Sequence, residues 1–81
     1  MKTSVEISYY PLNKEFVPHI KDFIERIKQY PDIAVRTNSM STQVFGEYKD
    51  VMNALTNEIE KSFSLPYSVF VLKIINADRE K

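Results

Sequence analysis

The sequence predicts an α+β sandwich, in which two helices cover one face of a four-stranded antiparallel sheet. Short segments with strand-like apolar patterns flank two longer segments whose apolar residues recur at helical spacing. Their order along the chain is strand, helix, strand, strand, helix, strand, which is typical of the ferredoxin-like βαββαβ arrangement. The chain has 81 residues and no internal repeat, low-complexity tract or linker. We therefore expect a single domain, residues 1–81.

The first strand is expected at residues 5–10, where apolar and polar side chains alternate. In this topology the first strand is central, between the third and the fourth. Its polar residues would bury unpaired groups if they faced the helices, so the apolar set should face the helices instead. The apolar set is Val5, Ile7 and Tyr9, and the polar set is Glu6, Ser8 and Tyr10.

Two amphipathic helices are expected on that face. Residues 16–30 carry an apolar stripe, and charged residues fill the opposite side. Pro18 has no amide hydrogen and must therefore lie in the first turn, whereas Pro31 marks the end of the helix. A second stripe runs over residues 48–63, and Pro66 separates it from the last strand.

Residues 33–37 and 42–47 are expected to form a hairpin, with residues 38–41 as its turn. We expect Val44 to pack inward next to Ile7. The outer face, away from the helices, then receives Gln43, Phe45 and Glu47, joined by Arg36 and Asn38 from the second strand. A shift of one residue would reverse every side chain, so the opposite assignment of the third strand stays open.

The last strand, residues 67–76, is apolar on both faces. Its inward members are Phe70, Leu72 and Ile74, and its outward members are Val69, Val71 and Ile75, beside Lys73. Two apolar faces imply cover on both sides, and the chain has no third helix to supply it. We therefore expect a second subunit to lay its sheet over this one, giving a dimer or a dimer of dimers. The tail, residues 77–81, is expected to be frayed.

The composition argues against several classes of function. Eleven basic and eleven acidic residues cancel, so nucleic acid is not expected as a partner. One glycine, Gly46, cannot form a glycine-rich phosphate loop. One histidine, His19, and no cysteine make a transition-metal site unexpected. No nucleophile lies in a pattern with a base, so we expect neither enzymatic activity nor a cofactor.

Two further features of the sequence favour a cytoplasmic protein. No apolar run approaches the roughly 20 residues that a membrane-spanning helix needs. The first six residues lack the apolar core of a signal peptide. We therefore expect no membrane insertion.

Residues 38–48 form the most informative stretch, because they gather small hydroxyls, two amides and an aromatic side chain where bulky apolar residues would suffice for folding. This run reads Asn-x-Met-Ser-Thr-Gln-Val-Phe-Gly-Glu-Tyr. Together with Tyr-Tyr-Pro-Leu at residues 9–12 and Ser-Val-Phe-Val-Leu-Lys-Ile-Ile-Asn at residues 68–76, it resembles the YkoF-like family of thiamine and hydroxymethylpyrimidine binders. Many relatives have glycine where this chain has Ser39.

The resemblance implies a ferredoxin-like fold assembled through its sheets, commonly as a homotetramer in the short single-domain members. It also implies binding of thiamine, vitamin B1, or of its hydroxymethylpyrimidine precursor. Carboxylates and amides on the outer face pair with an aminopyrimidine edge, and an aromatic side chain stacks on the ring. The residues expected around the pocket are Glu6, Ser8, Asn38, Met40, Ser41, Thr42, Gln43 and Phe45. A phosphorylated ligand is disfavoured, because only Arg36 and Lys73 are expected nearby.

Several of these residues have a structural interpretation as well. The Glu6 carboxylate either accepts hydrogen bonds from a ligand or forms an ion pair with Lys73 on the neighbouring strand. Asn38 also suits a turn, and Met40 also suits hairpin packing. Ser8, Ser41 and Thr42 are ligand contacts or small spacers between two sheets. Gln43 is the strongest single candidate, because an amide in a central strand needs partners on whichever face it occupies.

Our leading hypothesis from the sequence is a non-catalytic cytoplasmic binder of thiamine or hydroxymethylpyrimidine, acting as a carrier, buffer or sensor. The alternative is an oligomeric assembly module whose outer sheet face binds no small molecule. The two differ in their response to Gln43→Leu, which lowers ligand affinity in the first case and leaves the oligomer intact in the second.

Overall fold

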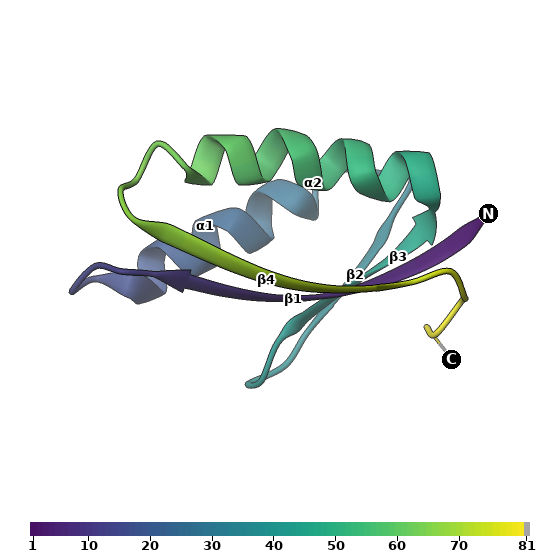
Figure 1. Cartoon of the computed structure of the whole chain (residues 1–81), viewed down its shortest axis with the longest axis horizontal. Coiled ribbons are helices and arrows are strands. Elements are labelled where there is room, and N and C mark those ends of the chain that lie inside the picture. Colours follow the sequence, from purple (N-terminus) through teal and green to yellow (C-terminus); the bar gives the residue numbers. More distant parts are fainter. Residues whose placement is uncertain (81) are drawn as a thin grey trace.

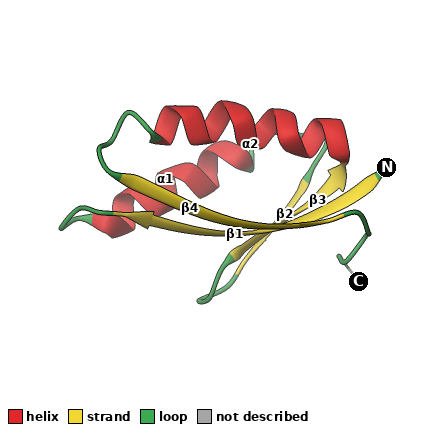
Figure 2. Ribbon diagram, in the orientation of Figure 1, coloured by secondary structure: helices red, strands yellow, loops and turns green. Residues whose placement is uncertain are grey.

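A computed structural model describes residues 1–80 and contains the six predicted elements in the predicted order (Figure 1). The strands are β1 (Lys2–Pro11), β2 (Ala34–Thr37), β3 (Thr42–Glu47) and β4 (Ser68–Ile75). The helices are α1 (Phe16–Ile27) and α2 (Tyr48–Ser62). All neighbouring strands are antiparallel, in the order β2-β3-β1-β4. Both helices lie on one face of the sheet (Figure 2), which confirms the ferredoxin-like α+β class.

The helix boundaries follow from the proline positions. Pro18 is the third residue of α1, where its missing amide hydrogen breaks no helical bond. The helix ends at Ile27, three residues earlier than the apolar stripe suggested, and turns connect it to Pro31. The second helix begins directly after β3 and ends at Ser62, before Pro66.

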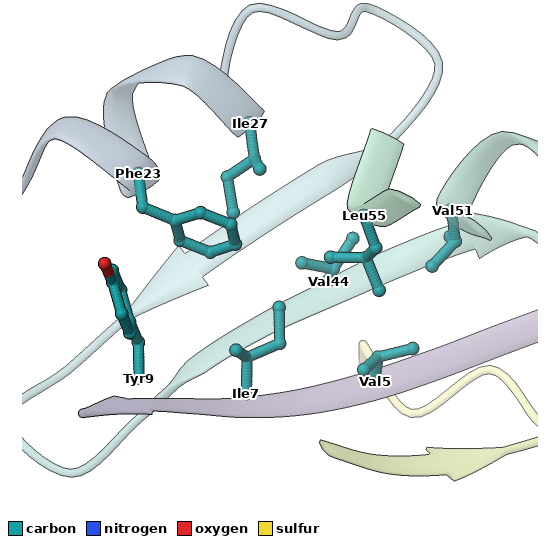
Figure 3. Close-up of a cluster of buried hydrophobic side chains, with 8 residues drawn as sticks. All are labelled: Val5, Ile7, Tyr9, Phe23, Ile27, Val44, Val51 and Leu55. Carbon is teal, nitrogen blue, oxygen red and sulfur yellow. The ribbon is translucent and has the colours of Figure 1, made fainter. Parts of the chain in front are cut away.

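The core lies between the sheet and the helices (Figure 3). The apolar set of β1 points into it, as predicted: Val5, Ile7 and Tyr9 are at most 9% exposed. The Tyr9 ring stacks on Phe70 of β4 at 4.1 Å between centroids, and it meets Phe23 of α1 edge-on at 5.7 Å. These aromatic contacts join α1 and the edge strand β4 to the central strand β1.

The register of β3 decides which of its side chains face outward. Val44 is fully buried, as predicted, but its neighbour on β1 is Val5, whereas Ile7 lies opposite Thr42. Ile7 is therefore the diagonal neighbour of Val44 on the same face, and both side chains belong to one buried cluster. Because Val44 points inward, Gln43 and Phe45 lie on the outer face, as expected.

The outer face carries the apolar members of β4 that the sequence assigned to it. Val69, Val71 and Ile75 are 42%, 52% and 41% exposed. On the inner face Phe70 and Leu72 pack against the core. Ile74 lies opposite Val5 on that inner face and is still half exposed, because β4 is an edge strand.

Gly46 allows the chain to pack closely before α2. A Cβ atom at this position would lie 3.2 Å from the carbonyl oxygen of Asp32 and 3.4 Å from the side chains of Ile33 and Val51. Its φ is not in the left-handed region. A side chain at this position would therefore crowd its neighbours, so the glycine serves close packing and not an unusual backbone angle.

The C-terminal segment, residues 76–80, does not fray. It turns back across the outer face, where Ser4 Oγ donates to the carbonyl oxygen of Ala77 at 2.7 Å and accepts from the amide of Arg79 at 2.9 Å. Arg36 and Glu80 form an ion pair at 3.7 Å. The expectation of a frayed tail was wrong for these residues, because a hydroxyl on β1 pairs with the tail backbone. Lys81 lies outside the described residues.

Candidate functional site

The outer face of the sheet holds a cavity of about 320 Å³. Its floor comes from β1, β3 and β4, and the C-terminal segment forms one wall. Figure 1 shows that segment on the side of the sheet opposite the helices. The polar and aromatic residues that line the cavity are Ser4, Glu6, Gln43, Phe45, Lys73 and Arg79. A volume of this size is within the range of small-ligand pockets.

Glu6 lies at the centre of this face, opposite Gln43 on one side and Lys73 on the other. One of its carboxylate oxygens is 3.7 Å from Lys73 Nζ, and the other accepts a hydrogen bond from Ser41 Oγ at 3.1 Å. The side chain of Lys73 is 83% exposed, so solvent weakens this ion pair. The pairing with Lys73 therefore exists, and it leaves the carboxylate reachable from the cavity.

Gln43 and Phe45 lie on β3, two residues apart and on the same face. Within residues 1–80 the Gln43 amide makes no hydrogen bond to another side chain or to the backbone, although the residue is partly buried. Phe45 is 6% exposed beneath the C-terminal segment and still lines the cavity. An amide with unused donors and acceptors thus lies beside an apolar ring.

Asn38 and Met40 belong to the tip of the β2–β3 hairpin. The side-chain oxygen of Asn38 accepts from the amides of Met40 at 2.7 Å and Ser41 at 3.0 Å, which is the geometry of an Asx turn. The structural interpretation of Asn38 as a turn residue is therefore confirmed. Met40 is 86% exposed at the tip, so it packs against nothing within the described chain.

Thr42 points to the opposite side from Glu6 and Gln43. It is 7% exposed on the helix face, and its hydroxyl is 3.1 Å from the hydroxyl of Thr37. Ser8 lies on the outer face opposite Val71. A second cavity of about 170 Å³ opens between the hairpin and α1, and the predicted residues that line it are Ser8, Asn38, Met40, Ser41 and Thr42.

The predicted set is thus divided between two cavities. The outer-face cavity contains Glu6, Gln43 and Phe45, and the smaller one contains the other five. Ser41 connects them, because its hydroxyl donates to Glu6. The sequence analysis placed all eight around one pocket, although the alternation that turns Val44 inward also turns Thr42 toward the helices.

Two residues of the outer-face cavity were missed. Ser4 continues the alternation of Glu6 and Ser8 along β1, so the strand pattern contained a signal for it. Arg79 had no such signal, because it belongs to the segment that was expected to fray. Its place in the wall depends on the two hydrogen bonds of Ser4.

Residues 1–80 contain no group of three or more His, Cys, Asp or Glu side chains that could hold a metal ion. Neither helix in that range is long and apolar enough to cross a membrane.

No protein-family model and no curated protein matches this chain. Solved structures do resemble it. Hypothetical protein MJ1052 of Methanocaldococcus jannascii is 26% identical with a TM-score of 0.81, and the alignment covers 99% of this chain and 84% of the other. A candidate thiamine biosynthesis/salvage protein of Thermotoga maritima, TM0486, is 20% identical with a TM-score of 0.83. That alignment covers 95% of this chain and 85% of the other.

A domain of unknown function, DUF77, from Bacillus cereus is also similar, at 14% identity and a TM-score of 0.79 over 98% of this chain and 79% of that one. At identities this low, the likeness to the Thermotoga and Bacillus proteins establishes the shared fold. The name of the Thermotoga protein adds a thiamine-related role for that protein. All of these findings agree with the fold expected for a YkoF-like chain.

Proposed function

We propose that this protein is a non-catalytic cytoplasmic binder of thiamine or its hydroxymethylpyrimidine precursor, and that it acts as a carrier, buffer or sensor. The observation that carries the proposal is the outer-face cavity, where a carboxylate, an unused amide and an aromatic ring meet. These groups belong to Glu6, Gln43 and Phe45. The structural likeness to the thiamine-related Thermotoga protein supports the same ligand class.

The chemistry of an aminopyrimidine suits these groups. Its exocyclic amino group donates to a carboxylate such as Glu6, and its ring nitrogens accept from an amide such as Gln43. The ring itself gains from contact with the apolar surface of Phe45. Ser41 orients the Glu6 carboxylate by donating to one of its oxygens at 3.1 Å.

The test is isothermal titration with thiamine and with hydroxymethylpyrimidine, using protein that was unfolded and refolded to remove any carried ligand. We expect saturable binding that Gln43→Leu and Glu6→Ala each weaken by about tenfold, since each variant removes one or two hydrogen bonds to a polar ligand. Gln29→Leu is the matched control, because Gln29 is an exposed amide in the turn that follows α1. No heat and no thermal stabilisation at millimolar concentration would rule out both compounds.

A second candidate function is assembly, and the exposed apolar row of the outer face favours it. Tyr10, Val69, Val71 and Ile75 are each more than 40% exposed. A second copy of the chain laid over this row would cover it, as a dimer or a tetramer. If assembly is the sole role, Gln43→Leu leaves the oligomer intact or more stable and no ligand affinity changes.

A further inference from the structure

Arg79 brings a positive charge to the outer-face cavity. The residue lines the cavity, and its backbone amide donates to Ser4 Oγ at 2.9 Å. The same hydroxyl donates to the carbonyl oxygen of Ala77 at 2.7 Å. One buried side chain on β1 therefore fixes the backbone on both sides of residue 78, and this places Arg79 in the wall.

The other charges of this face cancel in pairs. Glu6 pairs with Lys73, and Arg36 pairs with Glu80, each at 3.7 Å. Arg79 forms no ion pair with any residue from 1 to 80. The charge left over at the cavity is therefore positive.

The neighbouring acid does not neutralise Arg79. Asp78 lines a different cavity, which it shares with Lys2 and Glu80, and its carboxylate accepts from the amide of Glu80 at 3.1 Å. Consecutive residues of the tail thus belong to two cavities with different charge. Only the cavity that contains Glu6 and Gln43 gains the guanidinium.

We propose that Arg79 makes the outer-face cavity selective for a heteroaromatic ligand that carries an anionic group, of which a phosphate monoester is the simplest. This inference rests on the proposed function and names the substrate class for the same site. A guanidinium offers parallel N–H donors that match two phosphate oxygens, and Arg79 presents one in the wall of the cavity. The ring of the ligand then lies toward Gln43 and Phe45.

This conclusion differs from the expectation drawn from the sequence. A phosphorylated ligand was disfavoured there because only Arg36 and Lys73 were expected near the pocket. In the structure both of these cations pair with carboxylates. The cavity is also lined by Arg79, which was expected to lie in a frayed tail.

The test compares hydroxymethylpyrimidine with its phosphate monoester by isothermal titration, with inorganic phosphate as a third compound. We expect the monoester to bind about tenfold more tightly than the neutral compound, the usual effect of one charge-assisted hydrogen bond. Arg79→Gln should abolish that difference, and Arg79→Lys should retain part of it. Lys21→Gln, which removes a charge from an exposed position of α1, should have no effect.

Three results would overturn the inference, and they can be told apart. Equal affinity for the two pyrimidines in the unmodified protein removes the anionic preference and leaves the proposed function standing. Inorganic phosphate binding as tightly as the monoester shows a plain anion site. Absence of binding by both pyrimidines overturns the inference and removes hydroxymethylpyrimidine from the proposed function, whereas thiamine is decided by its own titration. Circular dichroism of Arg79→Gln confirms that the exposed substitution leaves the fold intact.

Discussion

At the scale of single residues, Glu58 shows how the helical layer holds a buried carboxylate. Its side chain is 3% exposed, accepts from Tyr30 Oη at 2.6 Å and lies 3.3 Å from Lys61 Nζ. Arg26 Nη1 is 3.5 Å from its other oxygen. Burial raises the pKa of Glu58, but the hydrogen bonds from Tyr30 and Lys61 and the charges of Lys61 and Arg26 outweigh it and lower the pKa below 4.5.

The lowered pKa of Glu58 makes stability depend on acid. Near pH 4.5 the unfolded chain binds more protons at this carboxyl than the folded chain does, so the free energy of unfolding falls as the pH falls from 4.5 through the lowered value. We expect Glu58→Gln to lose about 2 kcal/mol at pH 7, the cost of weakened hydrogen bonds to a charged group. Its unfolding free energy should then vary less below pH 4.5 than that of the unmodified protein.

Urea denaturation at several pH values measures both effects. Glu60→Gln is the matched control, because Glu60 is an exposed carboxylate on the same helix. If the free energy of unfolding falls equally steeply below pH 4.5 in Glu58→Gln and in the unmodified protein, the acid dependence does not come from Glu58.

At the scale of elements, the C-terminal segment and β1 act as one unit. Ser4 is 6% exposed, and its hydroxyl makes two hydrogen bonds to the segment. It donates to the carbonyl oxygen of Ala77 and accepts from the amide of Arg79. Phe45 is also buried on this outer face, which no helix covers. The segment therefore supplies local cover for the face on which the proposed ligand binds.

Ser4→Ala should release this segment. The variant removes both hydrogen bonds, so we expect the Arg79 amide to exchange with deuterium at least tenfold faster and the unfolding free energy to fall by about 1 kcal/mol. Ser8→Ala is the matched control, since Ser8 lies four residues along the same face of β1 and does not contact the tail. Unchanged exchange of the Arg79 amide in Ser4→Ala would show that the segment is held by other contacts.

At the scale of the whole molecule, the two faces of the sheet differ in their cover. The helices bury the inward side chains of the central strand β1, whereas the outer face has only the tail at one end. The apolar side chains that remain exposed there, Tyr10, Val69 and Val71, lie side by side on β1 and β4. This row is where we expect a second copy to pack.

Association through this row should be sensitive to a charge at its centre. Val71→Lys places an ammonium group among apolar side chains, and we expect the association to weaken by at least about 100-fold through the cost of desolvating that charge. Val17→Lys is the control, because Val17 is a similarly exposed valine at the start of α1. Light scattering at micromolar concentration gives the mass, and a monomeric mass for the unmodified protein would contradict the assembly.

The element order, the class of fold and the inward sides of β1 and β4 could be predicted from the sequence. These properties depend on local periodicity, which a strand or a helix imposes over a few residues. Val5 and Ile7 were assigned to the helix face on that basis, and Val44 was expected there too, although the opposite face of β3 was left open.

The arrangement of the candidate site follows only from contacts between distant segments. Ser4 meets Ala77 across 73 positions of sequence, and no local pattern signals such a contact. The same applies to the division of the predicted residues, because the face of β3 that the helices cover, and with it the direction of Thr42, was left open by the sequence. Contacts of this kind are set by the packing of distant segments, so the composition of the cavity, including Arg79, follows only from the folded chain.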